Sequence, residues 1–282
     1  MKNHHPLAHY HYEIGEKNIG KNPANPRDHA KLLVYDTVKD EISIDRFYNL
    51  INYLPENALM VMNNTGVIPA RVDFVKDTGG RVEGLVLVNE GWQEDGTIPV
   101  IVNKQIHVGR KLYIAEYEFE VLRQNHQYFY LKPRFNREIL PQILLEYGTT
   151  PTPKYLGKLD MEEHSLRERY QTVFAQEQKS VAAPTASLHF TQKVFDSLNA
   201  KNIRRAEVTL HVGMGTFAEV TEDNIQSQSL HTEPISISNS AWTQIQNYKT
   251  NHKPIIAVGT TAMRTLESQA GMLMSEPSGD IH

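Results

Sequence analysis

Small residues crowd together in residues 181–191, which read VAAPTASLHFT. Small side chains let a backbone approach a ligand closely, and loops on a rigid scaffold commonly carry binding residues. We therefore predict a binding loop that ends at Thr191, a residue type that caps helix starts. His189 in this run has two interpretations: a functional imidazole, or a core histidine satisfied by a loop packed beneath the helix.

Two glycines, Gly213 and Gly215, follow an expected strand at residues 207–212. Glycine takes positive φ at no steric cost and exposes amide donors to an anion or a ribose hydroxyl. The third glycine of the dinucleotide fingerprint is missing and no helix begins there. The segment therefore predicts backbone donors but not a dinucleotide cradle.

Residues 255–261 read IIAVGTT, a pattern typical of a buried strand, a tight turn and a helix start. Such a turn directs free N–H groups and the positive end of the helix dipole toward ligands above an α/β sheet. Arg264 and Glu267 lie three positions apart on the expected helix. An ion pair between them is the structural alternative to a binding role.

Arg71 follows a turn-rich stretch at residues 63–70. A guanidinium can bind a phosphate or a carboxylate through two parallel hydrogen bonds. Arg71 is therefore a candidate anion contact.

Four histidines near the N-terminus, His4, His5, His9 and His11, could bind a transition metal through imidazole nitrogens. No carboxylate lies among them to complete such a site, and a solvated terminus is the alternative.

The elements that position these segments change character along the chain. Strands are expected at residues 31–35 and 59–62 with a helix at residues 44–54 between them, and helical periodicity returns at residues 139–144. Between residues 71 and 135, short apolar-polar alternations separated by glycine turns predict a small barrel or sandwich. The expected strands there are residues 82–88, 98–102, 111–114 and 128–131.

Composition excludes several classes of protein. The 282 residues carry a net charge of -4, so no overall basic field indicates nucleic-acid binding. The absence of cysteine excludes disulfides, thiolate metal sites and a cysteine nucleophile. No apolar run approaches the ~20 residues of a membrane span, and no signal peptide is evident, so a cytoplasmic location is expected.

Four segments resemble one family. They are residues 170–174 (YQTVF), 180–191 (SVAAPTASLHFT), 209–217 (TLHVGMGTF) and 257–267 (AVGTTAMRTLE). They match Y-Q-T-V-[YF], V-A-A-P-T-A-G-L-H-F-T, T-L-H-V-G-x-G-T-F and A-V-G-T-T-x-x-R-x-L-E. From about residue 27 onward, the chain resembles the S-adenosylmethionine:tRNA ribosyltransferase-isomerase family of queuosine biosynthesis.

The resemblance implies a mixed α/β fold. Residues 1–70 and 136–282 would form a discontinuous α/β domain, interrupted by an inserted antiparallel β-barrel domain at residues 71–135. It also implies a transferase-isomerase reaction: the ribosyl group of S-adenosylmethionine moves onto a 7-aminomethyl-7-deazaguanine base in tRNA, giving epoxyqueuosine and releasing adenine and methionine. S-adenosylmethionine would be the substrate and tRNA the acceptor, with no metal or other cofactor and no membrane partner.

Such a reaction needs a base near the ribose carbon beside the sulfonium and a donor that helps adenine leave. His189 and His211 are the candidates, since imidazole titrates near pH ~6.5. Glu233, in a segment similar to the family's M-H-x-E, could hold ribose hydroxyls or act as the base. The remaining predicted substrate contacts are Arg71, Pro184, Thr185, Gly213, Gly215, Thr216, Gly259, Thr260, Thr261 and Arg264.

Several positions depart from the family pattern. Asn64 and Gly66 stand where N-D-T-R has an aspartate and an arginine, and Ser187 replaces a glycine. The family also continues beyond the last matched motif, so a further part of the sheet is expected to be missing. A non-catalytic relative that binds a nucleotide or RNA therefore stays open as an alternative. Any tRNA contact would need a local basic patch, such as Arg71, Lys76 and Arg81 or Lys201, Arg204 and Arg205.

Overall fold

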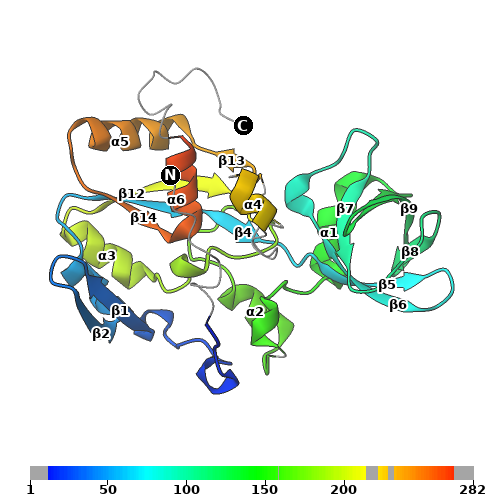
Figure 1. Cartoon of the computed structure of the whole chain (residues 1–282), viewed down its shortest axis with the longest axis horizontal. Helices are drawn as coiled ribbons and strands as arrows, with labels where there is room; N and C mark the ends of the chain where they lie inside the picture. Colours follow the sequence, from blue (N-terminus) through cyan, green and yellow to red (C-terminus); the bar gives the residue numbers. More distant parts are fainter. Residues whose placement is uncertain (1–11, 158, 214–221, 228–231, 270–282) are drawn as a thin grey trace.

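A computed structural model describes residues 12–157, 159–213, 222–227 and 232–269. It has two parts: a β-barrel on the right of Figure 1 and an α/β unit on the left. No helix in the described ranges is long and apolar enough to cross a membrane. The cytoplasmic location stays a prediction.

The barrel is closed and six-stranded, with neighbouring strands in the order β10-β7-β6-β5-β8-β9. Every pairing in it is antiparallel. Its strands are β5 (Arg71–Lys76), β6 (Arg81–Val86), β7 (Ile98–Val102), β8 (Lys111–Ile114), β9 (Tyr117–Asn125) and β10 (Tyr128–Pro133). The barrel confirms the predicted fold class, whereas the division into domains at residues 71 and 135 stays a prediction.

Apolar residues that alternate with polar ones along the strands fill the barrel interior. In β6 every second residue is buried, namely Val82, Gly84 and Val86. Phe74 and Phe119 are fully buried and meet edge to face, with ring centroids 5.7 Å apart. Gly84 faces the Phe74 ring, and a Cβ there would lie 2.6 Å from Phe74 Cε2. Only glycine therefore fits at this position without repacking.

The α/β unit is built on a four-stranded sheet in the order β13-β12-β3-β14. Its strands are β3 (Leu59–Asn63), β12 (Arg204–Leu210), β13 (Ile235–Ser236) and β14 (Ile255–Val258). Strand β3 is parallel to both β12 and β14 and is buried along its whole length, as an apolar central strand should be. Within the described residues β14 pairs only with β3, so Ile255 to Ala257 are half-buried rather than buried as predicted.

Helices cover both faces of this sheet. Helix α3 (Gln192–Ala200) packs with Phe47 and Met60 on one face, while α5 (Asn239–Thr250) and α6 (Gly259–Ser268) cover the other (Figure 1). Thr191 caps α3 as predicted, because its hydroxyl accepts the Val194 N–H at 3.3 Å. Helix α6 begins at Gly259, within the 255–261 segment that was predicted to contain a helix start.

The helix predicted at residues 44–54 is partly wrong. Strand β2 (Glu41–Arg46) pairs with β1 (Lys31–Asp36) in a separate hairpin, and a 3-10 helix follows at Phe47–Tyr53. The apolar spacing after Phe47 produced the helical pattern, but Ile44 is fixed in the hairpin opposite Leu33. The α/β layer therefore starts at β3 and not at residue 31.

Shorter elements join the two parts. Strands β4 (Thr65–Val67) and β11 (Glu177–Ser180) form a parallel pair, and the backbone of Arg71 bridges to Thr149 beside the barrel. The remaining helices are α1 (Leu140–Tyr147), α2 (Glu163–Arg169), α4 (Glu222–Ser227) and the 3-10 helices η2 (Glu16–Asn18), η3 (Arg27–His29), η5 (Val88–Glu90), η6 (Arg137–Ile139), η7 (Lys154–Leu156) and η8 (Thr185–Ser187).

Candidate active site

A cavity of about 620 Å³ lies where three sequence-predicted segments meet. The small-residue loop, the end of the 207–212 segment and the start of α6 each contribute to its wall. Its lining residues are Pro153, Tyr155, Tyr170, Ala182, Ala183, Pro184, Thr185, Ala186, Val212, Gly259, Thr260 and Thr261. The size and the mostly apolar wall with a few polar groups are typical of a small-molecule site.

Small side chains keep this cavity open. The Val181 N–H donates to the Val212 carbonyl at 3.1 Å, which ties the loop to the end of β12. Gly259 has a φ of +82°, and a Cβ there would lie 3.1 Å from the Ala186 Cβ. Glycine and alanine therefore allow the loop and the start of α6 to touch.

Helix α6 begins at the carboxyl end of β14, which is the sheet edge where α/β proteins bind ligands. The N-cap residue Val258 provides no side-chain hydrogen bond to the first turn, so the N–H groups of this turn have no side-chain cap, and Gly259, Thr260 and Thr261 line the cavity. The positive end of the helix dipole favours an anionic group there.

Glu233 joins three separate segments. Its Oε1 accepts the Gly213 N–H at 2.9 Å, and its Oε2 pairs with the Arg264 guanidinium. The Glu233 side chain is only 6% exposed. With both oxygens engaged, the carboxylate is suited to holding the Gly213 backbone against α6.

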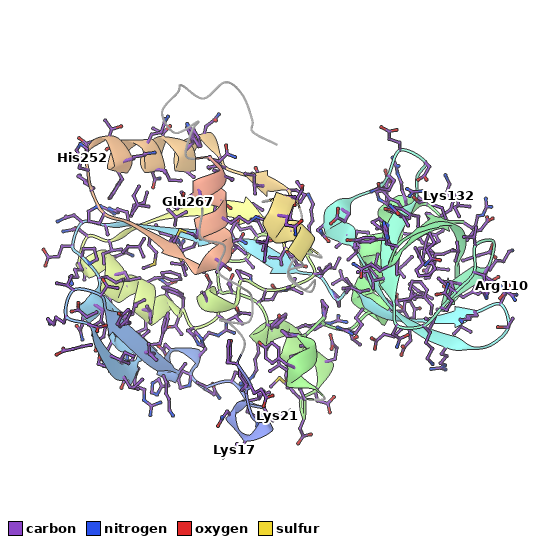
Figure 2. All side chains as sticks on the ribbon, in the orientation of Figure 1. Lys17, Lys21, Arg110, Lys132, His252 and Glu267 are labelled. Atoms are coloured by element: carbon purple, nitrogen blue, oxygen red, sulfur yellow. The ribbon has the colours of Figure 1, made fainter. Side chains whose placement is uncertain are left out.

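The structural alternative for Arg264, an ion pair with Glu267, is not formed. Arg264 turns to Glu233 instead, and Glu267 is exposed on α6 (Figure 2). Sequence spacing could not reveal this, because the partner lies 31 residues away.

His211 lies beside the same segments. Its backbone N–H donates to the Pro234 carbonyl at 3.1 Å, next to Glu233. Its ring Nδ1 lies 3.0 Å from the buried hydroxyl of Thr65. The structure therefore brings the segments of His211 and Glu233 together beside Val212, which lines the cavity, although neither His211 nor Glu233 is among its lining residues.

His189 lies elsewhere. Its ring is 5.3 Å from that of Phe47, and it lines a separate cavity of about 190 Å³ with Arg27 and Arg169. The structure does not bring His189 to the cavity that Thr185 and Val212 line. Its contact with Phe47 fits the packing interpretation of this histidine.

Arg71 is engaged within the fold. Its Nη1 pairs with Glu83 at 2.8 Å and its Nη2 donates to the Thr152 carbonyl at 3.4 Å. Arg71 is absent from the residues that line the 620 Å³ cavity. Gly66 is closely packed as well, since a Cβ there would lie 3.0 Å from Gln178 Cγ. Gly215 and Thr216 fall outside the described residues.

Sequence reasoning missed the aromatic wall and the barrel contact. Tyr155 and Tyr170 line the cavity, and burial raises the pKa of Tyr170 to about 12 against a smaller opposing effect of the Ala183 backbone. Tyr170 begins the YQTVF motif, which was the sequence signal that could have identified it.

Asn89 of the barrel packs closely on Gly213. A Cβ added to Gly213 would overlap the amide nitrogen of Asn89. No local pattern reveals that contact.

One of the two basic clusters serves mainly the fold. Lys201 donates to the carbonyls of Ile51 and Leu54, and Arg205 pairs with Glu207 at 3.2 Å and lies over Phe195. The N-terminal histidines lie outside the described residues. Among the residues that are described, no group of three His, Asp or Glu side chains is arranged to hold a metal.

Comparison with known proteins agrees with this assembly of motifs. The family model for the queuosine biosynthesis protein matches residues 7–281. The chain belongs to this family, which confirms the resemblance stated from the motifs.

Curated relatives carry the name S-adenosylmethionine:tRNA ribosyltransferase-isomerase. The Fusobacterium nucleatum protein is 36% identical over 270 residues, covering 93% of this chain and 74% of the relative. The Carboxydothermus hydrogenoformans protein is 38% identical over 266 residues, covering 94% and 77%. A crystal structure of S-adenosylmethionine tRNA ribosyltransferase from Thermotoga maritima has 25% identity and a TM-score of 0.41, covering 92% of this chain and 72% of that one.

Proposed function

We propose that this chain is an S-adenosylmethionine:tRNA ribosyltransferase-isomerase. It transfers the ribosyl group of S-adenosylmethionine to a 7-aminomethyl-7-deazaguanine base in tRNA, forms epoxyqueuosine, and releases adenine and methionine. The names of its relatives support this activity.

The observation that carries the proposal is the convergence of three motifs on one cavity. Residues of the small-residue loop, Val212 after β12 and the start of α6 line the same 620 Å³ space. The loop and the start of α6 are far apart in sequence, and all three segments match a family motif. A substrate bound there would lie beside His211 and the backbone that Glu233 holds.

The wall suits the parts of S-adenosylmethionine. Apolar and aromatic side chains such as Ala183 and Tyr155 can cover the adenine ring or the methylene groups of the methionine part, while the N–H groups at the start of α6 can bind its carboxylate. His211, which precedes the lining residue Val212, would act on the ribose or on the departing base. Glu233 and Arg264 would keep Gly213 in place while this occurs.

Adenine release from S-adenosylmethionine, followed chromatographically, tests the proposal. We expect release with tRNA that carries the aminomethyl-deazaguanine base and none with tRNA that lacks it. His211→Gln should reduce the rate by about 100-fold or more. His252→Asn, which changes a histidine in the turn after α5 (Figure 2), is the control and should leave the rate unchanged.

One observation favours a second candidate, a relative that binds but does not turn over. Gly66 stands in place of the family's arginine, and a Cβ there would lie 3.0 Å from Gln178 Cγ, so a larger side chain would require Gln178 to move. Binding of S-adenosylmethionine by folded protein without adenine release would support that candidate and refute the enzyme.

A further inference from the structure

Three neighbouring cavities form a row that begins at the candidate active site. A cavity of about 210 Å³ shares wall residues with the 620 Å³ cavity and also with the 190 Å³ cavity. The shared residues are Pro153, Tyr155, Tyr170 and Thr185 at the first junction and Pro23, Arg169 and Leu188 at the second. The row therefore leads from the small-residue loop to Arg169.

The charged side chains along this row have one sign. Lys21 (Figure 2), Arg27 and Arg169 line it, and among the described residues no carboxylate does. The whole chain has 33 acidic against 29 basic residues, so this lining does not follow from composition. A concave surface with positive charge alone favours an anionic ligand.

Arg27 holds the end of helix α2 and lies near a second guanidinium. Its Nη1 donates to the Gln171 carbonyl at 2.7 Å and its Nη2 to the Glu168 carbonyl at 3.3 Å. Burial, and after it the positive charge of Arg169, lowers the pKa of Arg27. The two arginines therefore interact as like charges in the 190 Å³ cavity that both of them line.

No counter-ion balances this pair within the described part of the chain. Arg169 is half-buried, and its guanidinium has no hydrogen-bond or ion-pair partner there. Asp28, which follows Arg27 in sequence, is buried and accepts the Thr191 hydroxyl at 2.9 Å. Like charges without a counter-ion raise the free energy of the unbound protein, and a bound anion relieves this cost. Phosphate is suited to the site, because its oxygens match the donors of a guanidinium.

An aromatic side chain indicates which phosphate compound fits the row. Tyr155 lines both the 620 Å³ and the 210 Å³ cavities and is 68% exposed. Exposed aromatic rings are the surfaces on which unpaired RNA bases stack. When such a base enters an enclosed pocket, its backbone phosphates stay outside that pocket. An aromatic ring followed by two guanidiniums therefore suits an unpaired segment of RNA.

We propose that Arg169 and Arg27 bind a backbone phosphate of the tRNA, beside the nucleotide whose base enters the 620 Å³ cavity. This inference rests on the proposed function and adds to it a contact that positions the acceptor. Of the three cavities, residues 259–261 at the start of α6 line only that of 620 Å³. The carboxylate of S-adenosylmethionine and the RNA phosphate therefore have separate sites.

Binding of labelled tRNA that carries the aminomethyl-deazaguanine base, followed by fluorescence anisotropy without S-adenosylmethionine, tests the contact. Arg169 is the residue to change, because Arg27 also holds the end of α2. We expect Arg169→Gln to raise Kd about 10-fold at about 50 mM salt and about 3-fold at about 200 mM, because one phosphate contact fewer makes binding less dependent on salt. Arg169→Lys keeps the charge and should stay within about 3-fold of the original chain.

Arg110→Gln is the control for a change in net charge. Arg110 lies at the end of the barrel that is far from α2 (Figures 1 and 2), and this variant should leave Kd unchanged. In turnover, Arg169→Gln should raise KM for tRNA about 10-fold, with kcat and KM for S-adenosylmethionine within about 3-fold. Its urea midpoint should equal that of the original chain, because no partner within the described residues is lost.

Several results would overturn the inference. They are unchanged tRNA binding in Arg169→Gln, equal weakening in Arg110→Gln, a lowered urea midpoint in Arg169→Gln, and no tRNA binding by the folded original chain. A rise in KM for S-adenosylmethionine alone would also overturn it, since Arg169 would then bind the methionine carboxylate. If tRNA binding shows the expected salt dependence but no adenine is released, the inference about the phosphate holds and only the proposed enzyme activity is refuted.

Discussion

Loss of Arg264 and loss of Glu233 should lower the free energy of unfolding by different amounts, because the two side chains differ in exposure. The Glu233 side chain is 6% exposed and that of Arg264 is 39% exposed. In Arg264→Met the carboxylate stays buried with the Gly213 N–H as its only remaining donor among the described contacts. Removal of one partner from a buried pair costs ~3–5 kcal/mol, and the partial exposure of Arg264 brings our expectation down to about 2–3 kcal/mol.

Glu233→Gln should cost less. The amide oxygen can still accept the Gly213 N–H, and the guanidinium can turn further into water, so we expect a loss of about 1 kcal/mol in the free energy of unfolding. The double variant should be more stable than Arg264→Met alone, because it no longer buries an unpaired charge.

Urea unfolding followed by circular dichroism measures these free energies, with the slope m unchanged across the set. Arg110→Met is the control: Arg110 pairs with Asp77 on the barrel surface (Figure 2), and this exposed pair should be worth less than about 1 kcal/mol. The reasoning is refuted if Arg264→Met costs no more than Glu233→Gln, or if the double variant is no more stable than Arg264→Met.

Three further outcomes are expected. Gly148→Ala should cost about 3 kcal/mol or more in urea unfolding, because its Cβ would overlap the Pro69 carbonyl; a smaller loss would mean that this backbone yields. Hydrogen bonds from the Thr97 hydroxyl and backbone N–H, with a smaller effect of Arg123, lower the pKa of Asp95 from 3.8 to about 2. The stability that ionised Asp95 contributes is therefore present above pH 3.8 and is lost as pH falls toward 2, and Asp95→Asn should flatten that part of the stability profile. Burial raises the pKa of Tyr170 from 10.0 to about 12, so its contribution is lost as pH rises through that range; Tyr170→Phe should shift alkaline unfolding to higher pH, and an unchanged midpoint would contradict this.

Local patterns predicted the elements that are fixed by their own residues. The strand, turn and helix at residues 255–268 and the Thr191 cap appear in the structure because apolar spacing and capping act over a few residues. The start of the helix predicted at residue 44 was wrong for the complementary reason. Ile44 is placed by its cross-strand partner Leu33, and spacing within one segment cannot reveal such a partner.

The candidate site was predicted in its segments but not in its contacts. Motifs located the loop before Thr191 and the turn at Gly259. The pairing of Arg264 with Glu233 and the packing of Asn89 on Gly213 depend on the tertiary fold, which no motif reveals. His189 shows the same limit, since its motif gives no indication that its ring packs on Phe47 and away from the cavity.

The sheet explains why these distant motifs meet. Strands β3, β12 and β14 are parallel, so the segments that follow them leave from the same edge. Those segments supply Thr65, the residues from His211 to Gly213, and the start of α6. The barrel is inserted after β4, in the chain that leaves β3 at this edge, and its η5 helix places Asn89 against Gly213. The barrel is therefore part of the wall that fixes the Gly213 backbone, and changes at this contact should reach the cavity through Glu233 and α6.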